Sequence, residues 1–138
     1  MLWIRLIITL FLASFVNACA VGQDTKAAEA VVAEFREHMA SAALGDIYDA
    51  AADDWKKAMS RDDTRAFLGA VNRKLGAVKT SKQTGWRDDV TTNGHLVTLE
   101  YHTEFEHGDG DEAFVVRLKN AHGQLAGYHI NSMAMMVN

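Results

Sequence analysis

The chain has 138 residues, of which 49% are hydrophobic, and its 14 basic and 18 acidic side chains give a net charge of −4 at pH 7. This length suits one small domain with its own core and is too short for two. Because basic residues are few and scattered, the positive surface that binds nucleic acid is excluded, and a single cysteine excludes an internal disulfide.

The first 18 residues have the layout of a secretory signal peptide. A positive charge at Arg5 precedes the apolar run LIITLFLASFV over 6–16, and the small residue Ala18 follows. The apolar run is shorter than a membrane-spanning helix. Cys19 comes next, and a cysteine in this place resembles the lipobox of bacterial lipoproteins, in which the signal is removed and the cysteine is acylated. We therefore expect residues 1–18 to be a signal peptide and Cys19 to be lipidated.

This interpretation of the amino terminus predicts where the protein works. The mature protein would be exported and held on the periplasmic side by the lipid on Cys19, and we expect it at the outer membrane. Residues 19–24 would form the lipidated cysteine and a short linker, and residues 25–138 a single domain. Two alternatives stay open: ordinary cleavage after Ala18 or Ala20, which gives a secreted protein, and an uncleaved membrane anchor.

Three amphipathic helices are expected in the first half of the domain. Apolar residues recur at helical spacing over 25–44, and Gly45 is expected to end this helix. Asp46 suits the N-cap of a second helix, whose apolar stripe extends over 48–59. Ser60, with an acidic residue three positions on, resembles a capping box and predicts the start of a third helix that ends at a glycine.

After the third helix the apolar period changes from about 3.6 to 2, which is typical of strands. Four strands are expected, over 81–87, 95–108, 113–119 and 124–132, joined as an antiparallel meander. Gly127 is expected to mark a bulge or a close helix contact. The expected fold class is therefore α+β, with three N-terminal helices packed on a curved four-stranded antiparallel sheet.

The faces of the central hairpin predict its register. In HLVTLEYHTEFEHG (95–108) apolar and polar residues alternate, so one face is expected in the core and the other in solvent. A turn at 108–111 would place Phe105 opposite Phe114. The same register gives four further pairs: Thr103 with Val116, Tyr101 with Leu118, His102 with Arg117, and Glu100 with Lys119.

Three stretches of the chain are similar to a known bacterial family. These are GDIYDAAADDW (45–55), LGAVKT (75–80) and FVVRLKNAHGQLAGYHINS (114–132), and together they resemble the domain of unknown function 4019 over roughly residues 30–132. His129 stands where that family often has an aromatic residue. The resemblance implies a small exported protein or lipoprotein with a cone-shaped fold similar to the cystatins and nuclear transport factor two. It transfers no catalytic residue, because the family has none established.

Cone-shaped enzymes such as ketosteroid isomerase place an acid or base beside a tyrosine in an apolar pocket. The polar residues expected near the interior here are His38, Tyr48, Tyr101 and His129, and we take these four as candidate pocket residues. For His38, a half-buried packing role is the more common alternative. No catalytic residue is assigned.

Two polar clusters invite a metal interpretation. Glu100, His102, Glu104 and Glu106 share one strand face, but alternate residues on a strand are about 6.6–7 Å apart, which favours a solvated face over a metal site. HGDGDE (107–112) has some spaced acids of a calcium loop, yet lacks the remaining ligands, and we expect a hairpin turn. No metal site and no cofactor are expected.

Together these features favour a module that binds in the cell envelope without catalysing a reaction. The expected contacts are the membrane, through the lipid on Cys19, and either an envelope protein or a small apolar ligand; a homodimer stays open. Two alternatives remain: a periplasmic inhibitor or immunity lipoprotein, and a small cone-fold enzyme that uses a His/Tyr pocket.

Overall fold

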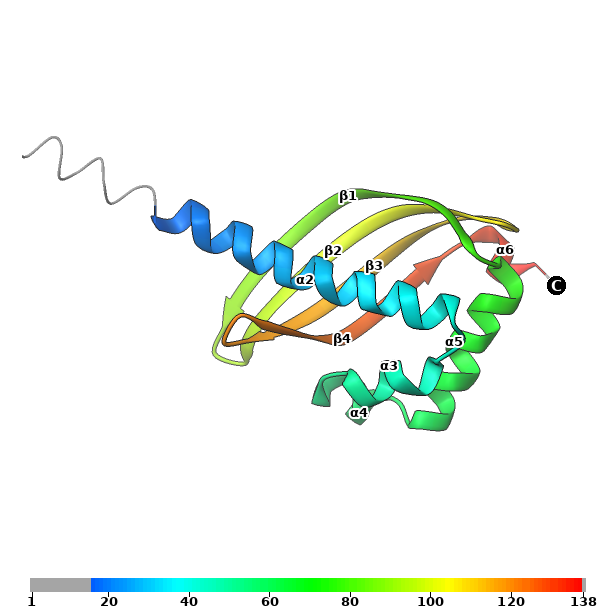
Figure 1. Ribbon diagram of the computed structural model, residues 1–138, viewed down its shortest axis with the longest axis horizontal. Helices are drawn as coiled ribbons and strands as arrows, with labels where there is room; N and C mark the ends of the chain where they lie inside the picture. Colours follow the sequence, from blue (N-terminus) through cyan, green and yellow to red (C-terminus); the bar gives the residue numbers. More distant parts are fainter. Residues whose placement is uncertain (1–15, 138) are drawn as a thin grey trace, which may run out of the picture.

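The computed structural model describes residues 16–137, with side chains from Gly22 onwards, and it is an α+β structure (Figure 1). In this part of the chain the helices are α2 (Val16–Ala40), α3 (Leu44–Ala50), α4 (Asp53–Ala58), α5 (Arg61–Leu75) and α6 (Met133–Met136). The strands are β1 (Val78–Thr91), β2 (Gly94–Phe105), β3 (Gly108–Lys119) and β4 (His122–Asn131). Residues 1–15 and the side chain of Cys19 lie outside the described part, so the signal peptide and the lipidation stay predictions.

The four strands form one antiparallel sheet in the order β1-β2-β3-β4, which confirms the expected meander. Helix α2 crosses one face of this curved sheet, and α3, α4 and α5 lie beside it (Figure 1). Within the described residues, no helix combines the length and the hydropathy needed to cross a membrane.

The core forms where α2 faces the sheet. Ala28, Val32 and Phe35 recur every three or four residues, so they make one apolar stripe, and all three are buried. The ring of Phe35 meets that of Phe114 edge-on, with centroids 5.1 Å apart, and that of Tyr128 at 4.8 Å. Burial of one such large side chain contributes about 1.5–3 kcal/mol, so this stripe holds α2 on the sheet.

The first helix begins and ends at other residues than those predicted from the sequence. It begins at Val16, so the stretch 20–24 that was expected as a linker is helical. It ends at Ala40, because Ala42 takes a left-handed conformation (φ 58°) and the amide of Ala43 donates to the carbonyl of His38 at 2.9 Å. This closing pattern is a Schellman motif. The prediction that Gly45 ends the helix was therefore wrong.

The second expected helix is two helices. Gly45 lies inside α3, and the prediction that Asp46 is its N-cap was wrong, because the N-cap is Ala43. Between α3 and α4, Ala51 and Ala52 are extended and buried. The amide of Ala52 donates to the carbonyl of Leu125 on β4 at 2.9 Å. This bond to the sheet uses a donor that a continuous helix would need, so it interrupts the helix.

The third expected helix is confirmed as α5. The hydroxyl oxygen of Ser60 accepts a hydrogen bond from the amide of Asp63 at 3.1 Å, as the capping-box pattern predicted. At the other end Gly76 has φ 73°, a conformation that favours glycine and turns the chain into β1.

The strand faces are as predicted, but the register of the central hairpin is not. Leu99 lies opposite Phe114 and Phe105 opposite Gly108, so the predicted Phe105–Phe114 pairing was wrong by six residues. Because six is an even number, every side chain stays on its predicted face. The other predicted pairs were wrong for the same reason: Thr103 lies opposite Gly110, Tyr101 opposite Glu112, His102 opposite Asp111, and Glu100 opposite Ala113.

The turn of this hairpin is at Glu106–His107, not at 108–111. The amide of Glu106 donates to the carbonyl of Ala77, and the amide of His107 to that of Leu75, each at 2.9 Å. The junction of α5 and β1 therefore fixes the turn. Gly110 lies within β3, where a Cβ atom would come within 2.9 Å of the Ile130 side chain.

The prediction of a bulge at Gly127 is confirmed. The pairing of β3 and β4 shifts by one residue there, since Val115 lies opposite Gly127 and Val116 opposite Leu125. The extra residue strengthens the local twist of β4.

Candidate functional site

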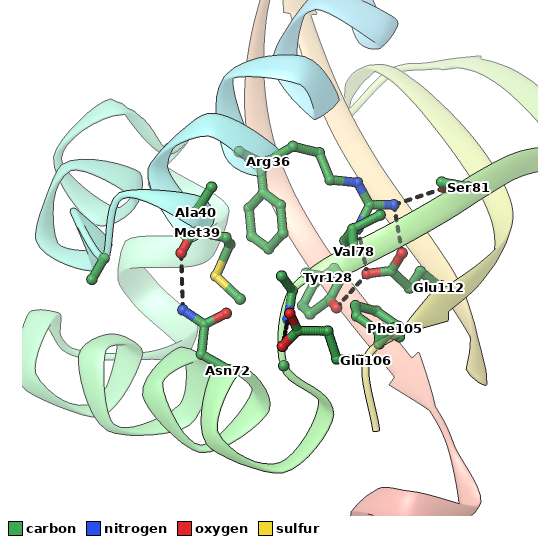
Figure 2. Close-up of a pocket in the computed structure, with 14 residues that line it drawn as sticks. Arg36, Met39, Ala40, Asn72, Val78, Ser81, Phe105, Glu106, Glu112 and Tyr128 are labelled. Carbon is green, nitrogen blue, oxygen red and sulfur yellow. Dashed lines mark hydrogen bonds and ion pairs between the residues drawn. The ribbon is translucent and has the colours of Figure 1, made fainter. Parts of the chain in front are cut away.

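The main pocket opens between the carboxyl-terminal half of α2, the junction of α5 and β1, and the sheet (Figure 2). Its volume is about 690 Å³, within the usual range for sites that hold small molecules. The residues that line it are Phe35, Arg36, Met39, Ala40, Ala42, Asn72, Gly76, Ala77, Val78, Ser81, Phe105, Glu106, Glu112 and Tyr128.

The walls of the pocket are mostly apolar. Phe35 and Met39 come from α2, Val78 from β1 and Phe105 from β2. The amide of Asn72 donates to the carbonyl of Met39 at 3.0 Å, and a carboxylate oxygen of Glu106 accepts from the amide of Ala77 at 3.2 Å. These two polar groups therefore hold the backbone at the pocket margin.

A buried carboxylate lies at the floor of the pocket. Glu112 is only 2% exposed, and Arg36 donates to both of its oxygens, from Nη1 to Oε1 at 3.0 Å and from Nη2 to Oε2. Tyr128 donates to Oε1 and Thr103 to Oε2, each at 2.6 Å. Four hydrogen bonds, two of which form the bidentate ion pair with Arg36, thus compensate a charge whose burial would otherwise be strongly unfavourable.

The donor directions in this cluster follow from Glu112. Because Thr103 gives its hydroxyl hydrogen to the carboxylate, the 2.8 Å contact between Ser81 and Thr103 has Ser81 as donor. The Ser81 oxygen also accepts from Arg36 Nη2 at 3.1 Å. The guanidinium lies 5.3 Å from the centre of the Phe114 ring, a cation–π distance. Figure 2 shows Arg36 reaching from α2 to Ser81 and Glu112 across the pocket.

Two tyrosines near the cluster stay protonated. Burial, reinforced by the Glu112 carboxylate, raises the pKa of Tyr128 far above its ordinary value. Burial also raises the pKa of Tyr101, whose ring centre lies 5.9 Å from the Arg36 guanidinium carbon. Both phenols are therefore neutral at physiological pH, and Tyr128 is a permanent donor to Glu112.

This arrangement is suited to binding and not to proton transfer. Both oxygens of Glu112 are occupied by donors, so the carboxylate has no lone pair aimed at a substrate in the pocket. Arg36 and Glu112 neutralise each other. Polar contacts remain for a ligand at the Ser81 oxygen and the outer edge of Arg36, whose side chain is 19% exposed.

The four candidate pocket residues are not gathered in this pocket. His38 borders a small hollow of about 30 Å³ between α2 and β4, where its Nε2 lies 3.5 Å from Glu34. Tyr48 lies on α3, with the Lys56 ammonium 5.7 Å from its ring centre. Their positions are consistent with packing and surface roles.

Tyr101 and His129 border another hollow, over β2, β3 and β4. They lie on opposite faces of the sheet, because Tyr101 is opposite the buried Glu112 while His129 is exposed and opposite Ala113. The two side chains therefore do not converge as a His–Tyr pair would require.

Three residues of this site were not predicted from the sequence: Arg36, Glu112 and Tyr128. Glu112 was assigned to a turn, although it lies two residues before Phe114 and so shares the core face of β3. An acidic residue in phase with a buried strand face is the signal that could have found it. Arg36 is adjacent to Phe35 on the core stripe of α2, and nothing in the sequence connects it with β3.

The polar outer face of β2 forms simple ion pairs. His102 Nδ1 lies 2.8 Å from Asp111, and its Nε2 lies 3.5 Å from Asp109. The hydrogen bond to Asp111 raises the pKa of His102. Arg117 pairs with Asp54 on α4 through two hydrogen bonds, at 2.6 and 2.8 Å, and not with His102 as predicted.

Comparisons with protein-family models, with curated proteins and with solved structures found no match to this chain.

Proposed function

We propose that this protein is an exported, lipid-anchored module of the cell envelope that binds a small, mainly apolar molecule without catalysing a reaction. The observation that carries the proposal is the pocket, with apolar walls formed by Phe35, Met39 and Phe105 and a neutralised Arg36–Glu112 pair at its floor. Export and anchoring at Cys19 are proposed from the amino-terminal sequence.

The charges around the pocket favour an uncharged ligand. The Arg36–Glu112 pair has no net charge to offer, and Glu106 at the margin would repel an anion. A ligand with an apolar body and one hydrogen-bonding group could place that group against Ser81 or the outer edge of Arg36.

A cone-fold enzyme is a weaker proposal. It would need an acid or base facing the cavity, whereas Glu112 is enclosed by donors and His129 is on the other face of the sheet. The similarity to the domain of unknown function 4019, and the cystatin-like or nuclear-transport-factor-two-like class that it implies, remain part of the proposal. A curved sheet crossed by one long helix is consistent with that class.

A fluorescent probe tests ligand binding. N-phenyl-1-naphthylamine is neutral, and 1-anilinonaphthalene-8-sulfonate has the same rings with a negative charge, so their comparison isolates the effect of charge. A chain that starts at Gly22 retains the buried core residues that the structure describes, from Ala28 onwards. We expect this chain to bind the neutral probe in a 1:1 complex and more tightly than the anionic probe.

A pocket-blocking variant locates the probe. Ala40 is exposed on α2 and lines the pocket, so Ala40→Phe is expected to reduce binding of the neutral probe at least about tenfold through loss of pocket volume. Ala33→Phe is the matched control, because Ala33 is exposed on the same helix and does not line the pocket. Equal binding by both variants would contradict the proposed site.

Anchoring has a separate test. Cells that express the full chain are labelled with palmitate, and the labelled band is expected to disappear with Cys19→Ala. Label that survives this substitution, or a mature chain that begins at Val21, would contradict lipidation.

Co-purification of a stoichiometric envelope protein from detergent extracts would favour a protein partner, such as the target of an inhibitor, over a small ligand.

A further inference from the structure

A second cluster of titratable side chains lies away from the pocket, where α2 meets the hairpin of β1 and β2. Asp24 comes from α2, Asp88 from β1 and His95 from β2. Their ligand atoms all lie within 4.8 Å of one another, and all three residues are half-buried. The sequence predicted no metal here, because Asp24 is distant in the chain from Asp88 and His95, and only the fold brings it to them.

Both carboxylates face the same nitrogen of His95. Its Nε2 lies 2.6 Å from Asp88 Oδ1 and 3.7 Å from Asp24 Oδ2. On a tetrahedral zinc ion with ligands at about 2.0–2.2 Å, two neighbouring ligand atoms are about 3.3 Å apart. The two observed distances lie on either side of this value, and no two of the ligand atoms are more than 4.8 Å apart, so changes of up to about 1.5 Å in their separations would bring the atoms to an ion.

The charge of the cluster also favours a cation. In residues 16–137, no lysine or arginine forms an ion pair with Asp24 or Asp88, whose only ion-pair partner is His95. Two carboxylates and one imidazole therefore share a half-buried space with at least one uncompensated negative charge.

A second histidine with two aspartates shows what a surface ion pair looks like in this protein. At His102 the two carboxylates contact different ring nitrogens, Asp111 at Nδ1 and Asp109 at Nε2. No single ion could take all three groups, and the His102 side chain is 45% exposed compared with 24% for His95. The convergence of Asp24 and Asp88 on one nitrogen is thus specific to the cluster at His95.

We propose that Asp24, Asp88 and His95 bind a divalent metal ion of the zinc class. Imidazole together with carboxylate is a ligand set that suits zinc, whereas calcium and magnesium prefer oxygen ligands alone. Three protein ligands leave one tetrahedral position for water. Because the ligands come from three elements, the ion connects the amino-terminal half of α2 to the β1–β2 hairpin.

The test uses the full chain, expressed in cells, purified in detergent through a tag without histidine, and stripped with EDTA. Zn²⁺ is titrated against a chromophoric chelator, and Co²⁺ absorption reports the coordination geometry. The expected result is one Zn²⁺ per chain, a tetrahedral Co²⁺ spectrum, a higher Tm with Zn²⁺, and no displacement by Ca²⁺.

Substitution of a ligand identifies the site. Asp24→Asn and His95→Gln are each expected to weaken Zn²⁺ binding by at least about tenfold, the smaller of the losses seen when even outer-shell groups are removed. His102→Gln is the matched control and is expected to leave binding unchanged. Asp24→Asn keeps the shape of the side chain, and its Tm in EDTA shows whether the fold is intact.

Three results would overturn the proposal. These are the absence of saturable Zn²⁺ binding to the wild-type chain, stoichiometric binding that survives both ligand substitutions, and displacement of Zn²⁺ by Ca²⁺. The first would make the cluster an ion pair only, and the second would place the metal elsewhere on the chain.

Discussion

The buried pair of Arg36 and Glu112 makes a prediction about stability that depends on which partner is removed. Arg36→Met leaves the Glu112 carboxylate, 2% exposed, with only Tyr128 and Thr103 as donors. Glu112→Gln leaves a guanidinium that is 19% exposed and can turn toward water in the pocket. The two substitutions break the same ion pair, but only the first leaves an enclosed charge.

The size of the effect follows from this asymmetry. An unpaired buried charge lowers the free energy of unfolding by roughly 3–5 kcal/mol, which is the expected cost of Arg36→Met. Loss of hydrogen bonds to a charged group costs about 1.5–3 kcal/mol, which is the expected cost of Glu112→Gln. Because Arg36 and Glu112 are in direct contact, the double variant should cost about 0.5–3 kcal/mol less than the sum of the single variants.

Urea unfolding followed by circular dichroism and tryptophan fluorescence measures these differences. Arg61→Met is the matched control, since Arg61 also donates twice to one carboxylate, that of Asp49, but both side chains are exposed. The urea midpoint of the Arg61→Met variant should be almost the same as that of the wild-type chain. The reasoning is refuted if Arg36→Met is no more destabilising than Glu112→Gln, or if the effects of the two substitutions add.

Three further predictions concern other parts of the chain. Ser60→Ala removes the cap of α5 and should lower the free energy of unfolding by about 1 kcal/mol in the same urea assay. The pKa of His102 is raised by its hydrogen bond to Asp111, so an NMR titration should give a midpoint above the ordinary value of 6.5, and Asp111→Asn should lower it. The stabilisation from this pair is present below the unfolded-state pKa and is lost as pH rises through the folded-state value. Gly110→Ala should lower Tm, because its Cβ would come within 2.9 Å of the Ile130 side chain and also within 3.0 Å of Ser132 Cβ and 3.1 Å of the Asn131 carbonyl oxygen, which is backbone and has little freedom to move.

A specific result would contradict each of these three predictions. An unchanged urea midpoint for Ser60→Ala would mean that the cap does not stabilise α5. If Asp111→Asn leaves the titration midpoint of His102 unchanged, the hydrogen bond to Asp111 is not the cause of the raised His102 pKa. The control for Gly110 is Gly22→Ala, since nothing lies within 4 Å of a Cβ at Gly22, and equal loss of Tm in both variants would contradict the steric argument.

Features that depend on local periodicity could be predicted from the sequence. The cap at Ser60 and the helix after it are local, as are the alternating faces of β2. The bulge at Gly127 was also visible, because a glycine interrupted the alternation of a strand.

Features that depend on contacts between distant segments could not be predicted from the sequence. The break at Ala51–Ala52 comes from a hydrogen bond to β4, and the turn at Glu106–His107 from bonds to the end of α5. The glycines of HGDGDE suggested a turn, but Gly110 lies inside β3, where a Cβ would come within 3.1 Å of the Asn131 carbonyl oxygen on β4. The register error followed directly from that misplaced turn.

The candidate site was the least predictable part. A charged residue on an apolar stripe, such as Arg36, gives no sign of its partner until the fold places Glu112 beside it. The polar residues chosen from the sequence, such as Tyr48 and His129, were selected by residue type and not by a shared cavity. Convergence in space is a property of the tertiary structure alone.

The most direct test of the binding site is a methyl NMR spectrum of the chain from Gly22, recorded with and without N-phenyl-1-naphthylamine. Met39 lines the pocket, whereas Met59 does not, and Met133 and Met136 are exposed near the carboxyl terminus. We expect the aromatic probe to shift the Met39 methyl signal strongly and to leave the Met59 methyl signal in place. A shift confined to Met133 and Met136, with Met39 unmoved, would place the probe on the surface and contradict the pocket as the functional site.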